Sequence, residues 1–288
     1  MKKIDTHQKA REVLTQWQAK LNDENIAKDG LLQHSVRFVL GQSYLDFEQQ
    51  FNNLGQQVVQ ELEAKVAEND FRLNLPRLAA YDSVGNFINE IEHHPFYADV
   101  GDGIYGSGLM QKVAKTGQLT QSLLLFYLTS HLGEAGHNCP VACTAGVIRV
   151  FKQVGDFEGK QAILQRLVTP SFRDNFTGAQ FVTEVQGGSD VGINSCRAVQ
   201  QSDGSWLISG EKWFCSNANA DIILMTARYD AIEGTKGLGL FMVKRLNEDG
   251  TPNGIKIRRL KEKIGTKAMA SAEIDFDNAQ AIAMGKPE

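Results

Sequence analysis

A ten-residue segment, FVTEVQGGSD at 181–190, carries residue types that bind anions and polar rings. It begins with strand-forming residues and ends in a polar, glycine-rich loop. Gly187 and Gly188 permit positive φ and leave backbone N–H groups uncovered. The hydroxyls of Thr183 and Ser189 can donate to carbonyl or phosphate oxygens. Alone, the segment is weak evidence for a binding site, because a Gly-Gly-Ser-Asp turn between strands is usually structural.

A second segment, GEKWFCSN at 210–217, places two adjacent aromatic residues and a hydroxyl at the end of a strand. Strict alternation along the strand predicts Phe214 and Ser216 on one face and Trp213 and Cys215 on the other. An aromatic ring and a hydroxyl on one face can flank a flat heterocycle. The alternative, favoured when this segment is considered by itself, is that both aromatic residues belong to the core.

The elements that must position these segments differ along the chain. Up to about residue 170 the pattern is helical. Apolar residues at helical spacing over 58–66 predict an amphipathic helix, and residues 121–132, apolar nearly all round, predict a buried one. Helices are also expected over 140–152, with a proline in the first turn, and over 159–168.

After Pro170 the sequence changes to short strand-like segments. These segments are 179–183, 195–200, 205–209, 212–216, 221–229, 239–244, 255–260 and 272–276. Residues 202–204 (SDG) predict a hairpin turn, and 247–254 (NEDGTPNG) predict a polar connection. We therefore predict an α+β fold: a helical domain over 1–175, followed by an antiparallel β-sandwich or barrel domain over 176–282.

The overall composition is that of a soluble globular protein, which we expect in the cytoplasm. Hydrophobic residues make up 42% of the sequence, and 30 Lys and Arg against 34 Asp and Glu give a net charge of −4. This balance offers no basic excess for nucleic-acid binding. The N-terminal MKKID lacks the apolar run of a secretory signal, and the longest apolar stretch, 123–128, is too short to cross a bilayer.

The four cysteines predict reduced thiols and no metal site. Cys139 and Cys143 are four residues apart and can share a helix face, but two thiols without further ligands make a poor zinc site. Cys196 and Cys215 lie in strand-like segments, and no pair has the C-x-x-C spacing.

Two other patterns are interpreted as structural. The glycine-rich 101–108 (GDGIYGSG) follows no strand, and a flexible connection between helices is expected there rather than a phosphate loop. His93 and His94 precede Pro95 at a helix entry. With His137, they are expected to be solvated or locally hydrogen-bonded, because no acidic cluster surrounds them.

Taken together, the order and separation of the two segments resemble the acyl-CoA dehydrogenase family. That family has a T-E-x-x-x-G-S-D loop, followed by a G-x-K-x-W-I-[ST]-N strand. The matching residues here are Thr183, Glu184, Gly188, Ser189, Asp190, Gly210, Lys212, Ser216 and Asn217. Phe214 stands where most members have Trp, and Cys215 where most have Ile. Both departures keep the character of the side chain, so they bear on substrate more than on fold.

Further segments are most similar to the AidB-like branch, which is linked with the adaptive response to alkylation damage. They are 91–97 (IEHHPFY), 136–140 (GHNCP), 211–214 (EKWF) and 260–265 (LKEKIG). Residues 258–273 also look like the stretch that closes the β domain in the family. The recognisable similarity covers about 75–285.

The resemblance implies an FAD-dependent oxidoreductase that removes the α and β hydrogens of an acyl-CoA thioester. By position, Thr183 and Ser216 would hydrogen-bond the flavin ring and Phe214 would pack against it. Ser189 and nearby N–H groups would reach the pyrophosphate. The implied cofactor-binding set is Phe181, Val182, Thr183, Gly188, Ser189, Phe214, Cys215 and Ser216.

In the family, a C-terminal helical bundle supplies the catalytic Glu, further FAD contacts and most of the oligomer interface. Residues 283–288 are expected to start the linker to that bundle, so the resemblance names no catalytic base in this sequence. It gives Glu184 a structural place. Expected partners are an acyl-CoA-like substrate, an electron-transfer partner and further copies of the protein, but no membrane. The alternative function is a flavoprotein that protects or binds DNA through the C-terminal region, with vestigial dehydrogenase activity.

Overall fold

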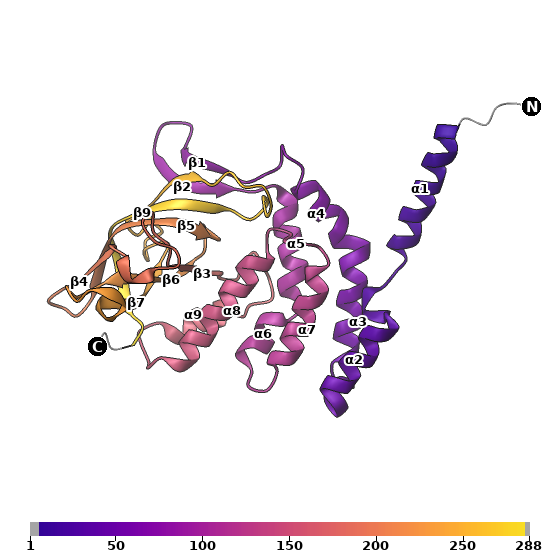
Figure 1. Ribbon diagram of the computed structural model, residues 1–288, viewed down its shortest axis with the longest axis horizontal. Helices are drawn as coiled ribbons and strands as arrows, with labels where there is room; N and C mark the ends of the chain where they lie inside the picture. The colour runs from indigo at the N-terminus through magenta and orange to yellow at the C-terminus, as the bar shows by residue number, and fades with distance from the viewer. Residues whose placement is uncertain (1–5, 286–288) are drawn as a thin grey trace, which may run out of the picture.

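The computed structural model describes residues 6–285, in which helices are followed by a β-barrel (Figure 1). The helices are α1 Thr6–Asn22, α2 Gly30–Leu40, α3 Glu48–Gln57, α4 Glu63–Asn69, α5 Pro95–Gly106, α6 Leu109–Ala114, α7 Leu119–Ser130, α8 Asn138–Gln153 and α9 Lys160–Leu167. The strands are β1 Arg77–Tyr81, β2 Phe87–Glu92, β3 Gly178–Phe181, β4 Arg197–Gln200, β5 Trp206–Ser216, β6 Ile222–Arg228, β7 Leu238–Lys244, β8 Ile255–Leu260 and β9 Ser271–Ala283. The predicted α+β fold class is confirmed.

The predicted helices are present, with one difference in burial. A π-helical turn, Val58–Leu62, joins α3 to α4 and buries the apolar face predicted over 58–66. Pro140 lies in the first turn of α8 as expected. On α7, however, Leu123 and Tyr127 are exposed. The apolar character of that helix therefore did not mean burial on every side.

Most of the glycine-rich stretch expected to be a flexible connection, residues 101–106, is instead part of α5, and residues 107–108 join α5 to α6. A Cβ on Gly101 would lie 2.4 Å from the Phe172 ring, and one on Gly103 would lie 2.7 Å from Leu62. These glycines are needed because neighbouring side chains pack directly against the helix backbone. The prediction was wrong there because glycine occurs both in flexible connections and in helices against which neighbouring side chains pack closely.

The β strands close into a barrel. Strand β6 pairs with β7, β7 with β9, β9 with β5, β5 with β4, and β4 with β6. Most pairings are antiparallel as predicted, but β3 and β4 each run parallel to β6. The interior is apolar, and its buried residues include Phe181, Ile208, Ile223, Phe241 and Ile274.

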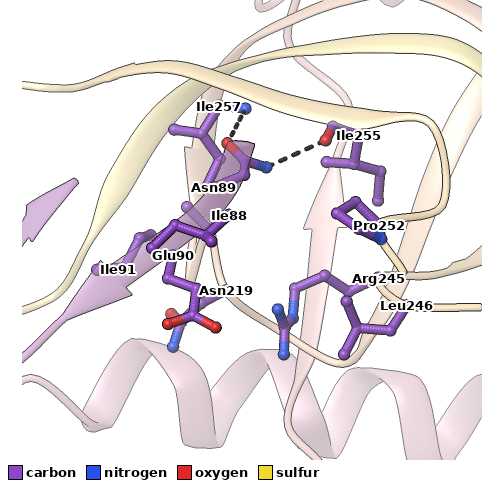
Figure 2. A pocket seen from close by; sticks show the side chains of 11 residues that line it. Ile88, Asn89, Glu90, Ile91, Asn219, Arg245, Leu246, Pro252, Ile255 and Ile257 are labelled. Carbon is purple, nitrogen blue, oxygen red and sulfur yellow. Dashed lines mark hydrogen bonds between the residues drawn. The ribbon is translucent and has the colours of Figure 1, made fainter. Parts of the chain in front are cut away.

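A hairpin formed by β1 and β2 lies inside the part of the chain that the sequence predicted to be helical. Its Asn89 has a φ of 54° and reaches the edge of β8. The Asn89 amide donates to the Ile255 carbonyl at 3.0 Å and accepts from the Ile257 N–H at 2.9 Å (Figure 2). The Asn89 side chain thus makes the two backbone hydrogen bonds that a neighbouring strand would make, and it joins the hairpin to the barrel.

Strand β5 is continuous where two strands, 205–209 and 212–216, were predicted. The interruption in the pattern is a shift in register against β9 at Gly210, followed by a second between Lys212 and Cys215. Such bulges bend a strand and turn its side chains without ending it. The predicted hairpin turn at 202–204 does join β4 to β5.

Candidate functional site

The two segments with the chemical residue types lie side by side in the structure. The Trp213 N–H donates to the Thr183 carbonyl at 2.9 Å. Near the other end, the Asn217 side-chain amide donates to the Gly178 carbonyl at 3.0 Å. Residues 178–183 and the end of β5 therefore lie side by side. We call the surface that they form, from Thr183 at one end to Ser216 at the other, the ledge.

A buried ion pair holds the loop after β3 in place. The Glu184 carboxylate lies 2.7 Å from the Lys212 ammonium, and the two residues are only 2% and 1% exposed. The Lys212 ammonium also donates to the Val182 carbonyl at 3.2 Å. Because Lys212 belongs to β5, the pair ties the two segments together from inside the barrel.

The remaining partners of the Glu184 carboxylate are also within the protein. It accepts hydrogen bonds from the backbone N–H groups of Ser195 and Cys196 and from the Gln186 amide. Burial alone would raise the pKa of Glu184, but the Lys212 ammonium and these N–H groups lower it to about 2. A carboxylate that is ionised and surrounded by donors is a poor proton acceptor, which agrees with the structural place expected for Glu184.

The two loop glycines have different roles, and neither has a positive φ. A Cβ on Gly187 would lie 2.5 Å from the Asp190 carbonyl oxygen, so that glycine is required by the fold of the loop. A Cβ on Gly188 would meet only the Thr183 methyl group, at 3.6 Å. The space beside Gly188 is therefore open to a ligand.

Two hydroxyls of this loop are available for binding. Thr183 is half-buried and Ser189 is exposed, and within residues 6–285 neither side chain forms a hydrogen bond. Asp190, by contrast, accepts from the Gly192 N–H at 3.1 Å and caps a short 3₁₀ turn. In this loop, Asp190 therefore stabilises the backbone, whereas the hydroxyls of Thr183 and Ser189 are free to bind a ligand.

The aromatic pair of β5 does not alternate as predicted. Lys212 and Cys215 are both buried, and the bulge places Trp213 and Phe214 together between them. The Lys261 ammonium lies 3.3 Å from the Trp213 ring centroid and 5.7 Å from that of Phe214. Strict alternation failed because the two aromatic residues share one position opposite β9.

Exposure separates the predicted site residues into two groups. Phe214 is 48% exposed, so it is not a core residue, and Ser216 is half-buried at the end of β5. Phe181 and Cys215 are fully buried in the barrel interior. The side chains of these last two lie away from the surface, so only their backbones are available to a ligand.

Helix α8 begins beside this ledge. The Cys139 and Cys143 sulfurs lie 3.9 Å apart on successive turns, as the spacing predicted. A hydrogen bond from Cys143 lowers the pKa of the Cys139 thiol, and the Ser216 hydroxyl and the Lys263 charge lower it further. The sequence pattern did not indicate that this thiol lies next to the Ser216 hydroxyl.

Other cavities lie elsewhere on the molecule. One of about 150 Å³ lies under the β1–β2 hairpin and is lined by Glu90, Asn219 and Arg245 among others (Figure 2). Over residues 6–285 no cluster of three or more His, Cys, Asp or Glu side chains has the geometry to hold a metal ion. No helix in that range is long and apolar enough to cross a membrane.

Comparison with known proteins identifies both parts of the chain. Residues 16–172 match the family described as the adaptive response protein AidB N-terminal domain. Residues 179–279 match the acyl-CoA dehydrogenase middle domain. The two matches meet close to the point where the helices give way to the barrel.

Among curated relatives, acyl-CoA dehydrogenase family member 11 of Caenorhabditis elegans is 30% identical over 274 residues, covering 89% of this chain and 44% of the relative. The putative acyl-CoA dehydrogenase AidB of Escherichia coli K12 is 30% identical over 230 residues, covering 74% of this chain and 40% of the relative. The chain thus spans less than half the length of these two relatives.

Solved structures give the same result. The crystal structure of C. elegans ACDH-11 in complex with C11-CoA superposes with a TM-score of 0.82 at 27% identity, covering 90% of this chain and 46% of that one. The Bd2924 apo-form superposes with a TM-score of 0.84 at 26% identity, covering 91% of this chain and 54% of that one.

Proposed function

Because this chain belongs to the acyl-CoA dehydrogenase family, in its AidB-like branch, we propose that it forms part of the flavin and substrate site of an FAD-dependent acyl-CoA dehydrogenase. The observation that supports this most directly is the ledge made by β3 and β5. It carries an exposed aromatic ring, Phe214, and the half-buried hydroxyls of Thr183 and Ser216. An aromatic ring and hydroxyl groups on one surface suit a flat ring with polar edges.

The residues present fit FAD. Thr183 has a free hydroxyl, the surface beside Gly188 is open, and Ser189 is exposed and able to donate to a pyrophosphate. In this proposal Thr183 and Ser216 hydrogen-bond the ring, and Phe214 packs against it. Ser189 and the N–H groups around Gly188 reach the pyrophosphate.

The other proposed contacts are made by the main chain. The Val182 carbonyl already accepts from the Lys212 ammonium and the Asn194 amide. That carbonyl is therefore held by the protein, which leaves the Val182 N–H for a ligand. Phe181 and Cys215 have buried side chains and contribute backbone groups and shape. FAD, when bound, supplies the acceptor for the hydride, while these residues orient it and keep water from its edge.

We further propose that the substrate is an acyl-CoA thioester and that the protein acts in the cytoplasm. The four thiols are all free, which suits a reducing compartment. Electron transfer to a partner and assembly with further copies stay predictions. Electron transfer follows from the family rather than from any contact within this chain.

FAD binding is the test of this proposal. We expect FAD to bind with quenching of its fluorescence. Thr183→Val and Ser216→Ala should each weaken binding by about 2- to 10-fold, the range expected for one lost hydrogen bond. Ser202→Ala, in the exposed β4–β5 turn, is the matched control and should bind FAD like the parent protein. Equal affinities for all four proteins would remove the assigned roles of both hydroxyls.

A second candidate function is favoured by the match of residues 16–172 to the adaptive response family. In that case the protein is a flavoprotein scaffold that binds DNA and has only vestigial dehydrogenase activity. Anaerobic addition of acyl-CoAs of several chain lengths discriminates the two functions. Rapid bleaching of the flavin supports the dehydrogenase, whereas no bleaching together with salt-sensitive DNA binding supports the scaffold.

A further inference from the structure

The first two turns of α8 hold two thiols in contact beside the ledge. Cys139 and Cys143 are half-buried, and their sulfurs lie 3.9 Å apart. The other two cysteines, Cys196 and Cys215, are buried in the barrel. A pair that is both in contact and partly accessible therefore exists at only this place among residues 6–285.

The surroundings of the two thiols differ. Cys139 lies in the first turn of α8, where the helix dipole favours a negative charge. It is also near the Lys263 ammonium and the Ser216 hydroxyl, opposed by the Glu134 carboxylate. The hydrogen bond with Cys139 and burial raise the pKa of the Cys143 thiol. The helix dipole and the nearby Lys263 ammonium therefore favour Cys139 as the thiolate of the pair.

We propose that Cys139 and Cys143 form a peroxide-sensitive thiol pair, in which Cys139 is oxidised first and Cys143 then closes a disulfide within α8. In the first step the Cys139 sulfur attacks a hydroperoxide. An S–O bond forms, the O–O bond breaks, and the leaving oxygen takes the thiol proton and departs as an alcohol or water. In the second step the Cys143 sulfur attacks the Cys139 sulfur, and hydroxide leaves with the Cys143 proton as water.

Closing this disulfide must open the first turn of the helix. Side chains four residues apart on a helix have Cβ atoms about 5–6 Å apart, whereas a disulfide needs about 3.8 Å. The turn that must move includes the Cys139 N–H, which donates to the Glu134 carboxylate at 3.0 Å. Oxidation would also remove the Cys139 thiol from the Ser216 hydroxyl. Oxidation of the pair would therefore change how the first turn of α8 packs against the ledge.

Thiol mapping tests the pair without any cofactor. The reduced protein is treated with equimolar hydrogen peroxide, alkylated and analysed by peptide mass spectrometry. We expect Cys139 and Cys143 to disappear as free thiols and to appear as one intramolecular disulfide, with Cys196 and Cys215 still reduced. Cys139 should react at least about tenfold faster than Cys196, because thiolate character and access control the rate.

Variants separate the two roles. Cys143→Ser should accumulate a sulfenic acid on Cys139 that dimedone traps, and Cys139→Ser should slow oxidation of Cys143 by about tenfold or more. Cys196→Ser is the matched control and should form the disulfide at the parental rate. Oxidation of all four thiols at similar rates, a disulfide between two molecules, or no sulfenic acid in Cys143→Ser would overturn the proposal.

Hydrogen exchange tests the effect on the helix. In the oxidised protein we expect faster exchange at the amides of the first two turns of α8, with no change in α9. Unchanged protection in both helices would contradict the predicted opening. The mass spectrometry and the exchange do not depend on FAD, so they can fail while the proposed dehydrogenase function holds, and the reverse is equally true.

Discussion

A single buried ion pair fixes the position of the backbone around Thr183. The ion pair of Glu184 and Lys212 is buried, and its partners include the Val182 carbonyl and two backbone N–H groups. A buried charge that loses its partner is strongly destabilising, whereas an exposed pair contributes little. The pair therefore holds the loop in a single position that a ligand can use.

Replacing Lys212 by Met should be costly, because it leaves the Glu184 carboxylate buried without a counter-ion. We expect the free energy of unfolding to fall by about 3–5 kcal/mol. Arg77, in an exposed pair with Glu92, is the matched control, and Arg77→Met should cost no more than about 1 kcal/mol. Urea denaturation measures both. A loss below about 1 kcal/mol for Lys212→Met would show that the pair does not hold the loop.

Titration of buried groups should give two overlapping windows of acid sensitivity. Burial lowers the pKa of His93 to about 4 and that of His137 to about 3. In the unfolded chain histidine titrates near 6.5. Below that pH the unfolded state binds more protons, so stability falls as the pH drops from about 6.5 toward about 4 for His93 and about 3 for His137. Glu184, with a folded pKa of about 2, loses its contribution only as the pH falls below about 4.5.

The measurement is the free energy of unfolding as a function of pH. His137→Gln should flatten the slope between about pH 6.5 and 3. Gln does not titrate, and it can still donate to the Tyr97 carbonyl that His137 contacts at 2.7 Å. An unaltered slope in that variant would mean that His137 is not kept neutral by its burial.

At the scale of elements, the register of β5 shapes the site. Its first irregularity is at Gly210, whose φ is 135°. A Cβ there would lie 2.7 Å from the Cys196 sulfur and 2.9 Å from the Cys196 Cα. The second irregularity brings Trp213 and Phe214 together. Both irregularities lie within residues 210–217, the second of the two segments whose residue types indicate a binding site.

Gly210→Ala should therefore destabilise the barrel. We expect a loss of about 2 kcal/mol or more, since the change adds both a backbone strain and a close contact. Gly265→Ala is the control, because a Cβ there meets no atom within 4 Å and the backbone is unstrained. Its unfolding free energy should stay within about 0.5 kcal/mol of the parent protein. Equal stability of the two variants would show that β5 can do without the bulge.

The sequence predicted the elements better than their irregularities. Helical periodicity predicted the buried face from Val58 to Val66, and turn residues predicted the β4–β5 hairpin. Alternation failed at Trp213, because a bulge is decided by contacts with β9 and leaves no local pattern. The β1–β2 hairpin was missed because Asn89 acquires its role only by reaching β8, 166 residues away in the chain. Glu184 was correctly given a structural place, but its ion pair with Lys212 depends on tertiary packing.

At the scale of the whole molecule, the described chain exposes apolar side chains at its N-terminal end. Figure 1 shows α1 extending away from the other helices. On α1, Val13, Leu14 and Trp17 are more than half exposed, and on α2 Phe38 is 83% exposed. Large exposed apolar surfaces in globular proteins mark interfaces. We therefore expect the chain to associate with a second copy through these two helices.

Association should depend on the apolar residues of α1. We expect the triple variant Val13→Ser, Leu14→Ser, Trp17→Ser to weaken self-association by about tenfold or more, because a single buried Trp in an interface contributes more than about 1.4 kcal/mol. Val84→Ser, in the exposed β1–β2 turn, is the control for general surface polarity and should associate like the parent chain. Sedimentation equilibrium over a range of concentrations measures both. A monomer at every concentration would show that the chain does not self-associate, and equal association of the two variants would place the interface elsewhere on the molecule.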